Sequence, residues 1–248
     1  MKIYSHRGYS SKYPENTLIA FAKALEYDAD GIECDVQLTK DRVPVIIHDE
    51  KINRTSNGKG YVKDYTYEEL LHFDFAHHKP GDYGKLPIIT LRELLLLIQD
   101  SKKFITLNIE LKNDRFNYEG MEEIILNEVK DFEDKMAIIY SSFNHNSMKL
   151  IKKLKPDAQT AALVDNERHD LIPYLKTLKV DGIHPSILIL DEEIIAELIA
   201  NNIYVNVYTI NDAALAQRLA DNKVAGVFTD YCKEMKETLL YGKKFSID

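Results

Sequence analysis

Short runs rich in β-branched residues alternate with amphipathic helical segments through the whole sequence of 248 residues. This alternation is typical of parallel strands joined by helical crossovers, because a parallel pair needs a connection of about a dozen residues or more. We predict strands at residues 3–5, 31–37, 104–110, 137–141, 159–163, 182–184, 204–209 and 226–229. Eight strand–helix units without a break for a second domain favour a closed (β/α)8 TIM barrel over an open doubly wound sheet.

The helical segments carry apolar stripes behind N-terminal capping residues. Apolar side chains at positions 18, 21, 22 and 25 follow Asn16 and Thr17, either of which is suited to cap a helix. Thr90 and Glu93 form the pattern of a capping box, and Asp191 stands before another apolar stripe. These stripes predict helices that pack one face against the sheet.

We expect one catalytic barrel domain over residues 1–248, because hydrophobic residues make up 45% of the chain, enough for one large core. Residues 51–87 do not fit the repeat, since they combine several Gly and Pro with one short helical pattern near residues 67–73. We interpret them as an insertion after the second strand region. Loops that follow barrel strands line the active-site face, so we expect a lid or substrate wall there, with a surface loop of no function as the alternative.

Acidic residues outnumber basic ones, and the formal net charge is −8 at pH 7. A field of this sign repels nucleic acid and anionic membranes, so an anionic substrate needs local neutralisation. The purest apolar run, residues 94–98, is far shorter than the ~20 residues of a membrane span. We therefore expect no nucleic-acid partner and no integral membrane segment, and, without a targeting segment, a cytoplasmic protein.

Two carboxylates share one face of the second predicted strand. Side chains alternate between the two faces of a strand, so Glu33 and Asp35 of the run GIECDVQLT point the same way and Cys34 points the opposite way. Two buried acids repel each other unless a cation lies between them. A hard divalent ion with oxygen ligands meets this need, and for this pair alone an ion pair with Arg or Lys meets it equally well.

A third acid, Glu110, shares a face of the next predicted strand with Asn108 and Lys112. Three carboxylates supply about half of the six or more oxygen ligands that Mg²⁺ or Ca²⁺ takes, which leaves positions for water and substrate phosphate. We therefore predict a divalent metal site at Glu33, Asp35 and Glu110, with Mg²⁺ and Ca²⁺ both open. Lys112 lies one step outward, where its ammonium group is expected to meet the phosphate.

Two histidines stand beside these acids. His6 ends the first predicted strand and His48 ends the run VPVIIH, and in a barrel both positions open toward the C-terminal face. Two imidazoles that flank a phosphate can divide the proton transfers, one deprotonating the nucleophile and the other protonating the leaving alkoxide. Arg7 has a planar guanidinium suited to two phosphate oxygens, with a surface ion pair as the alternative.

A set of motifs runs along the chain in a specific order. It begins with His6-Arg7-Gly8, Pro14-Glu15-Asn16-Thr17, residues 33–41 (ECDVQLTKD), Pro44-Val45 and His48-Asp49. It continues with Arg54-Thr55, Gly58, Gly60, Glu69-Leu70, Pro87, Thr90-Leu91, Glu93 and the segment 110–112, and later with residues 142–143, 207–211 and 226–231. Over nearly the full length these motifs resemble those of the glycerophosphodiester phosphodiesterases, which are (β/α)8 barrels.

The resemblance implies an enzyme that hydrolyses small glycerophosphodiesters to glycerol 3-phosphate and an alcohol such as choline or ethanolamine. It also implies specific roles: His6 and His48 as acid–base catalysts, Glu33, Asp35 and Glu110 as metal ligands, and Arg7 and Lys112 as substrate phosphate contacts. Tyr208 stands where the family commonly has Trp. We expect its ring to form an aromatic wall of the substrate pocket.

Two other functions remain open at this point. A hydroxyl of the substrate, in place of water, can attack phosphorus and give a cyclic phosphate. A barrel of this kind can also bind phosphorylated ligands without turnover, although the presence of every reactive group speaks against that function. The sequence leaves open the preferred alcohol, the assignment of acid and base to the two histidines, and the oligomeric state.

Overall fold

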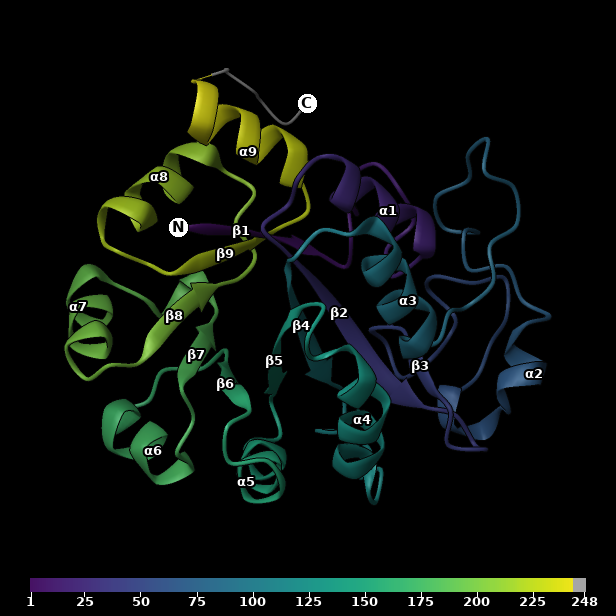
Figure 1. Ribbon diagram of the computed structural model, residues 1–248, viewed down its shortest axis with the longest axis horizontal. Helices are drawn as coiled ribbons and strands as arrows, with labels where there is room; N and C mark the ends of the chain where they lie inside the picture. The colour runs from purple at the N-terminus through teal and green to yellow at the C-terminus, as the bar shows by residue number, and fades with distance from the viewer. Residues whose placement is uncertain (243–248) are drawn as a thin grey trace.

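The computed structural model describes residues 1–242, which form a ring of parallel strands surrounded by helices (Figure 1). The ring strands are β1 (Lys2–His6), β2 (Gly31–Leu38), β4 (Thr106–Leu111), β5 (Ala137–Ser142), β6 (Gln159–Val164), β7 (Gly182–Pro185), β8 (Tyr204–Val207) and β9 (Gly226–Thr229). Each strand pairs in parallel with its neighbours, and β1 pairs with both β2 and β9, which closes the ring. The predicted (β/α)8 barrel is confirmed; of the domain expected over 1–248, residues 243–248 lie outside the described part.

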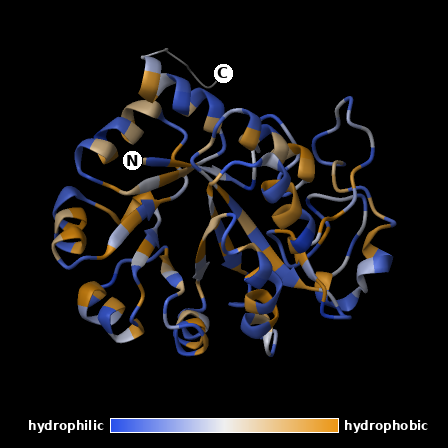
Figure 2. Ribbon diagram, in the orientation of Figure 1, coloured by the Kyte–Doolittle hydropathy of each residue, from blue (hydrophilic) through white to orange (hydrophobic). Residues whose placement is uncertain are grey.

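The outer layer consists of α1 (Leu18–Glu26), α3 (Leu91–Ser101), α4 (Met121–Val129), α5 (His145–Leu154), α6 (Leu171–Leu178), α7 (Glu192–Ala200), α8 (Ala213–Asp221) and α9 (Cys232–Tyr241), with short 3₁₀ turns η2 (Lys130–Phe132) and η3 (Ile187–Ile189). The predicted caps are confirmed: Thr17, Thr90 and Asp191 each accept a backbone N–H in the first turn, and Glu93 completes the capping box. Hydrophobic and hydrophilic residues alternate along these helices (Figure 2), which bury the hydrophobic ones against the strands.

A ninth strand, β3 (Pro44–Ile46), lies outside the ring and pairs antiparallel with the end of β2. The pairing joins Val36 with Ile46 and Leu38 with Pro44. We did not predict this strand, because an alternation of apolar and polar residues cannot be recognised over only three residues. The resulting hairpin turns the chain back over β2 before it enters residues 51–87.

Residues 51–87 contain no strand of the ring and carry η1 (Val62–Asp64) and α2 (Tyr67–Leu70). They lie beside α1, α3 and β3 (Figure 1). The short helix predicted near residues 67–73 is confirmed, although it ends at Leu70. A separate hydrophobic cluster holds the segment together: Val45, Ile47, Ile52, Val62, Leu70, Phe75 and Ile88. The segment is therefore a packed unit with its own small core.

The inside of the barrel is filled below its C-terminal mouth. Tyr4 points inward and occupies the space that a side chain at Gly31 or Gly226 would need, since a Cβ atom there would lie 2.4 or 2.6 Å from its ring. The Tyr4 and Phe228 rings pack with their centroids 5.1 Å apart. The Tyr4 and Phe228 rings therefore fill part of the barrel interior.

No helix in residues 1–242 is both long enough and apolar enough to pass through a membrane.

Candidate active site

Three carboxylates gather at the barrel mouth because the registers of adjacent strands align them. β1 pairs His6 with Glu33, and β2 pairs Asp35 with Glu110 of β4. The ligand-type oxygens of Glu33, Asp35 and Glu110 all lie within 4.8 Å of one another. We call these three residues the acidic cluster. All three are buried, so their charges are poorly screened by water.

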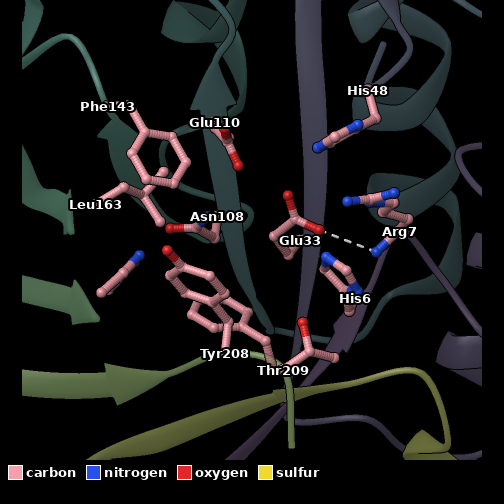
Figure 3. A pocket seen from close by; sticks show the side chains of 12 residues that line it. His6, Arg7, Glu33, His48, Asn108, Glu110, Phe143, Leu163, Tyr208 and Thr209 are labelled. Atoms are coloured by element: carbon pink, nitrogen blue, oxygen red, sulfur yellow. Dashed lines mark hydrogen bonds between the residues drawn. The ribbon is translucent and has the colours of Figure 1, made fainter. Parts of the chain in front are cut away.

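The acidic cluster has oxygens that the protein leaves without partners. Glu33 Oε2 accepts the backbone N–H of Arg7 at 2.9 Å (Figure 3), and Asp35 Oδ2 accepts from Asn16 Nδ2 at 2.9 Å. Glu33 Oε1 and Asp35 Oδ1 are buried with no hydrogen-bond partner in the described part of the chain. Buried polar atoms are normally satisfied, and oxygens this close together fit a hard divalent cation.

Basic side chains neutralise the acidic cluster only in part. Arg7 Nε lies 3.3 Å from Asp35 Oδ2, and Lys112 Nζ lies 2.8 Å from Glu110 Oε1. The ion-pair alternative considered from the sequence is thus partly realised. However, Arg7 also pairs with Glu15, and within residues 1–242 Glu33 forms no salt bridge. The acidic cluster therefore keeps an excess of negative charge, which favours binding of a cation.

The three acids differ in how strongly they hold a proton. Burial raises the pKa of Glu33, and the Asp35 and Glu110 charges raise it further. Burial also raises the pKa of Glu110, although Lys112 opposes the shift. For Asp35, burial is outweighed by nearby Arg7, His48 and Lys112 and by the Asn16 hydrogen bond, so its pKa is lowered. Asp35 is therefore the most firmly ionised of the three.

His6 is oriented by a carboxylate that we did not predict as a site residue. His6 Nδ1 lies 2.8 Å from Oδ1 of Asp230, which follows β9. Asp230 also accepts hydrogen bonds from Ser10 Oγ and Asn211 Nδ2. Burial alone would raise the pKa of Asp230, but these hydrogen bonds lower it. An ionised Asp230 accepts a hydrogen bond from Nδ1–H, which leaves His6 Nε2 as the atom available to a substrate.

His48 reaches the barrel mouth from outside the ring of strands. It does not end a strand of the ring; it follows β3, where Ile47 N donates to Asp35 O and Gln37 Nε2 donates to His48 O. Its Nδ1 lies 2.7 Å from Oδ1 of Asp49. Asp49 was also missed, although the motif His48-Asp49 was a signal for it. Both histidines therefore share one arrangement, with Nδ1 bonded to a carboxylate.

Arg54, from residues 51–87, connects two parts of the site. It bonds both Glu15 carboxylate oxygens at 2.7 Å and both Asp49 oxygens, at 2.8 and 3.0 Å. Glu15 in turn accepts from Arg7 Nη1 at 3.0 Å. A continuous chain of charged contacts therefore runs from Arg7 through Glu15, Arg54 and Asp49 to His48. Neither Glu15 nor Arg54 was among the predicted site residues, although both belong to the motifs.

These groups line a pocket of about 240 Å³ at the barrel mouth. One wall carries His6, Arg7, Glu33 and His48, and the facing wall carries Phe143, Leu163 and Tyr208 (Figure 3). Asn108, Glu110, His184, Thr209 and Phe228 complete the lining. The pocket thus offers charge and proton-transfer groups on one side and apolar or aromatic surface on the other.

A larger hollow of about 820 Å³ adjoins the pocket and shares His48 and Phe143 with it. We call it the outer hollow; its other lining residues are Asp49, Glu50, Lys51, Tyr61, Lys112, Asp114, Arg115 and Asp165. Of the predicted site residues, Lys112 lines the outer hollow, whereas Asp35 is fully buried beside Glu33. The other predicted residues, His6, Arg7, Glu33, His48, Glu110 and Tyr208, line the pocket.

Comparisons with known proteins point to one family. The family model described as the glycerophosphoryl diester phosphodiesterase family matches residues 6–234. A glycerophosphodiester phosphodiesterase of Bacillus altitudinis is 42% identical over 232 residues, which cover 93% of this chain and 94% of the relative. One of Caldanaerobacter subterraneus subsp. tengcongensis is 36% identical over 230 residues, 92% of this chain and 93% of the relative. An Oleispira antarctica phosphodiesterase, solved in complex with the product sn-glycerol-3-phosphate, is similar in fold with a TM-score of 0.91 at 28% identity, with 96% of each chain covered.

Proposed function

The chain belongs to the glycerophosphoryl diester phosphodiesterase family, and on that premise we propose that it hydrolyses glycerophosphodiesters to glycerol 3-phosphate and an alcohol at a divalent cation. The observation that carries the proposal is that Glu33 and Glu110 of the acidic cluster line the same pocket as two histidines, His6 and His48, each backed by a carboxylate. The product bound to the Oleispira antarctica relative supports the same substrate class.

Glu33, Asp35 and Glu110 would hold the cation, Mg²⁺ or Ca²⁺. The unpartnered oxygens of Glu33 and Asp35 support this assignment, because the ligands of such ions are oxygens. When bound, the cation would offset the charge of the phosphodiester and withdraw electrons from phosphorus. It would also remove the mutual repulsion of the three acids and favour their ionised forms.

The two histidines would carry the protons. One Nε2 takes a proton from the attacking water, and the other donates a proton to the leaving alkoxide oxygen. Asp230 and Asp49 keep the Nδ1 atoms protonated, so each Nε2 alternates between base and acid without rotation of the ring. Each role is typically worth about 10² to 10⁴ in rate.

The remaining predicted residues would bind the substrate. Arg7 brings positive charge to the pocket wall, and Lys112 brings it to the outer hollow, so a phosphate between them is neutralised from both sides. Tyr208 and Phe143, whose ring centroids are 6.3 Å apart, would cover the carbon skeleton. We propose that the glycerol phosphate part occupies the pocket and the alcohol occupies the outer hollow, which has the larger volume.

The whole chain, residues 1–248, would act as one catalytic domain with residues 51–87 on the active-site face. Lys51 and Tyr61 from this segment line the outer hollow, and Arg54 bonds Asp49. The segment would therefore shape the site of the leaving alcohol and hold a partner of His48.

Purified protein should be assayed with glycerophosphocholine, glycerophosphoethanolamine and glycerophosphoinositol. We expect release of glycerol 3-phosphate, its loss with a chelator, and its recovery on addition of Mg²⁺ or Ca²⁺. Phosphorus NMR of the products distinguishes glycerol 3-phosphate from a cyclic phosphate. A cyclic phosphate would show that a hydroxyl of the substrate, and not water, attacks phosphorus. The absence of glycerol 3-phosphate with all three substrates would refute the proposed reaction.

A further inference from the structure

His184, at the end of β7, is a buried titratable residue of the pocket to which the reaction above gives no role. Its side chain is completely buried, yet it lines the same pocket as His6 and Glu33. The Phe228 ring lies against it edge to face, with the ring centroids 4.9 Å apart. Burial lowers the pKa of His184 to about 3, so the imidazole is neutral at physiological pH.

The hydrogen bond from Asn206 determines the tautomer of this neutral ring. Asn206 Nδ2 lies 3.2 Å from His184 Nε2, and both side chains are buried. An amide nitrogen only donates, so Nε2 accepts and the ring proton resides on Nδ1. The ring is thus held from below as a neutral hydrogen-bond donor.

The donor group has no acceptor in the protein. His184 Nδ1 is buried without a hydrogen-bond partner within residues 1–242. The same is true of Oδ1 of Asn108, another residue of the pocket, whose Nδ2 donates to Ser141 Oγ at 3.0 Å. An unpartnered buried group destabilises a fold unless a ligand satisfies it. The pocket therefore offers one neutral donor and one neutral acceptor in addition to its charged groups.

We propose that His184 recognises a hydroxyl group of the glycerol moiety by donating from Nδ1, and that it thereby determines specificity for glycerol esters over other phosphodiesters. A hydroxyl oxygen accepts from the Nδ1–H group, and its own proton remains free for an acceptor such as Asn108 Oδ1. A neutral donor suits an uncharged hydroxyl, whereas Arg7 and Lys112 suit the phosphate. This inference rests on the proposed function, since it requires a glycerol ester in the pocket.

A role of His184 in specificity and a role in packing predict different effects on two substrates, one with a glycerol hydroxyl and one without. Loss of a donor to a hydroxyl slows only the ester that carries the hydroxyl, because its oxygen then loses its partner in the pocket. Loss of packing slows every substrate equally. The ratio of kcat/KM for glycerophosphoethanolamine to that for bis(4-nitrophenyl) phosphate, which has no hydroxyl group, therefore separates the two.

The test compares this ratio in the wild type, His184→Phe, which removes the donor and keeps a ring, and His184→Asn, which places an amide N–H near the Nδ1 position. His145→Asn is a matched control, because both of its ring nitrogens already have partners, Tyr174 Oη and Leu163 O. We expect the ratio to fall roughly tenfold in His184→Phe, to recover in His184→Asn, and to stay within about twofold in His145→Asn.

An unchanged ratio in both His184 variants would overturn the inference, as would an equal fall in His184→Phe and His145→Asn. If the wild type cleaves the nitrophenyl diester but no glycerol ester, the proposed function itself is wrong, and the inference is wrong with it. Failure of the proposed function and failure of the inference can be told apart, because activity of the wild type tests the function and the His184 variants test the inference.

Discussion

His6 Nδ1 and Asp230 Oδ1 lie 2.8 Å apart, although the two residues are 224 positions apart in the sequence. His6 ends β1 and Asp230 follows β9, and the pairing of these two strands closes the barrel. Closure of the ring and orientation of a proposed catalytic histidine therefore depend on the same contact between the ends of the chain.

Replacement of Asp230 by Asn should lower kcat by about 10²-fold or more, with little change in KM, because the ring of His6 loses the charge that stabilises its protonated form. Steady-state kinetics with a glycerophosphodiester measures the change. Ser10→Ala, which removes a neutral hydrogen bond from the same carboxylate, should cost less than tenfold. Equal effects of the two substitutions would contradict the orienting role.

The same carboxylate makes the fold sensitive to acid. The pKa of Asp230 is lowered in the folded protein, so its contribution to stability is present above the unfolded pKa of about 3.9 and is lost as the pH falls below that value. The free energy of unfolding of the wild type should therefore fall more steeply than that of Asp230→Asn as the pH is lowered from about 5 to about 2. Urea titrations across this range measure it; parallel curves would refute the prediction.

His6→Ala and His48→Ala should each reduce turnover by about 10² to 10⁴ while the fold is retained, because each removes one proton-transfer group and no buried apolar contact. Circular dichroism checks the fold, and product release checks turnover. A variant with near-complete turnover would show that its histidine transfers no proton in the reaction.

Addition of Mg²⁺ or Ca²⁺ should raise the melting temperature of the wild type, because a ligand that binds only the folded state stabilises it. Glu33→Gln should lose most of this rise, since it removes a charged ligand whose Oε1 has no protein partner. Glu26→Gln, an exposed acid on α1 that pairs with Lys23, is the control and should keep it. A full metal-dependent rise in Glu33→Gln would place the cation elsewhere.

Arg54→Ala should lower kcat roughly tenfold and leave KM nearly unchanged, because Asp49 and Glu15 both lose their bidentate partner and His48 is less well oriented. Arg54→Lys should restore only part of the activity, since an ammonium group cannot bond two carboxylates in fork geometry. Arg92→Ala removes a surface guanidinium that pairs with Glu128, and kcat should not change. A rise in KM alone for Arg54→Ala, with kcat unchanged, would indicate a substrate contact in place of an orienting role.

Local periodicity was enough to predict the barrel and the acidic cluster. The alternation of strand and helix patterns indicates the ring, and the period of two places Glu33 and Asp35 on one face, because side-chain direction along a strand depends only on the neighbouring residues. The caps at Thr17, Thr90 and Asp191 were predictable for the same reason, since a cap bonds residues of its own first turn.

The partners of the site residues were decided only by the tertiary structure. The pairs His6–Asp230 and Arg54–Glu15, the return of β3 that brings His48 over β2, and the unpartnered Nδ1 of His184 all depend on ring closure, strand register and loop packing. These join residues far apart in the chain, and no local pattern encodes which of them meet. The sequence by itself determined which chemical groups face the barrel mouth, and the closed fold decided which of those groups are oriented, neutralised or left free for a ligand.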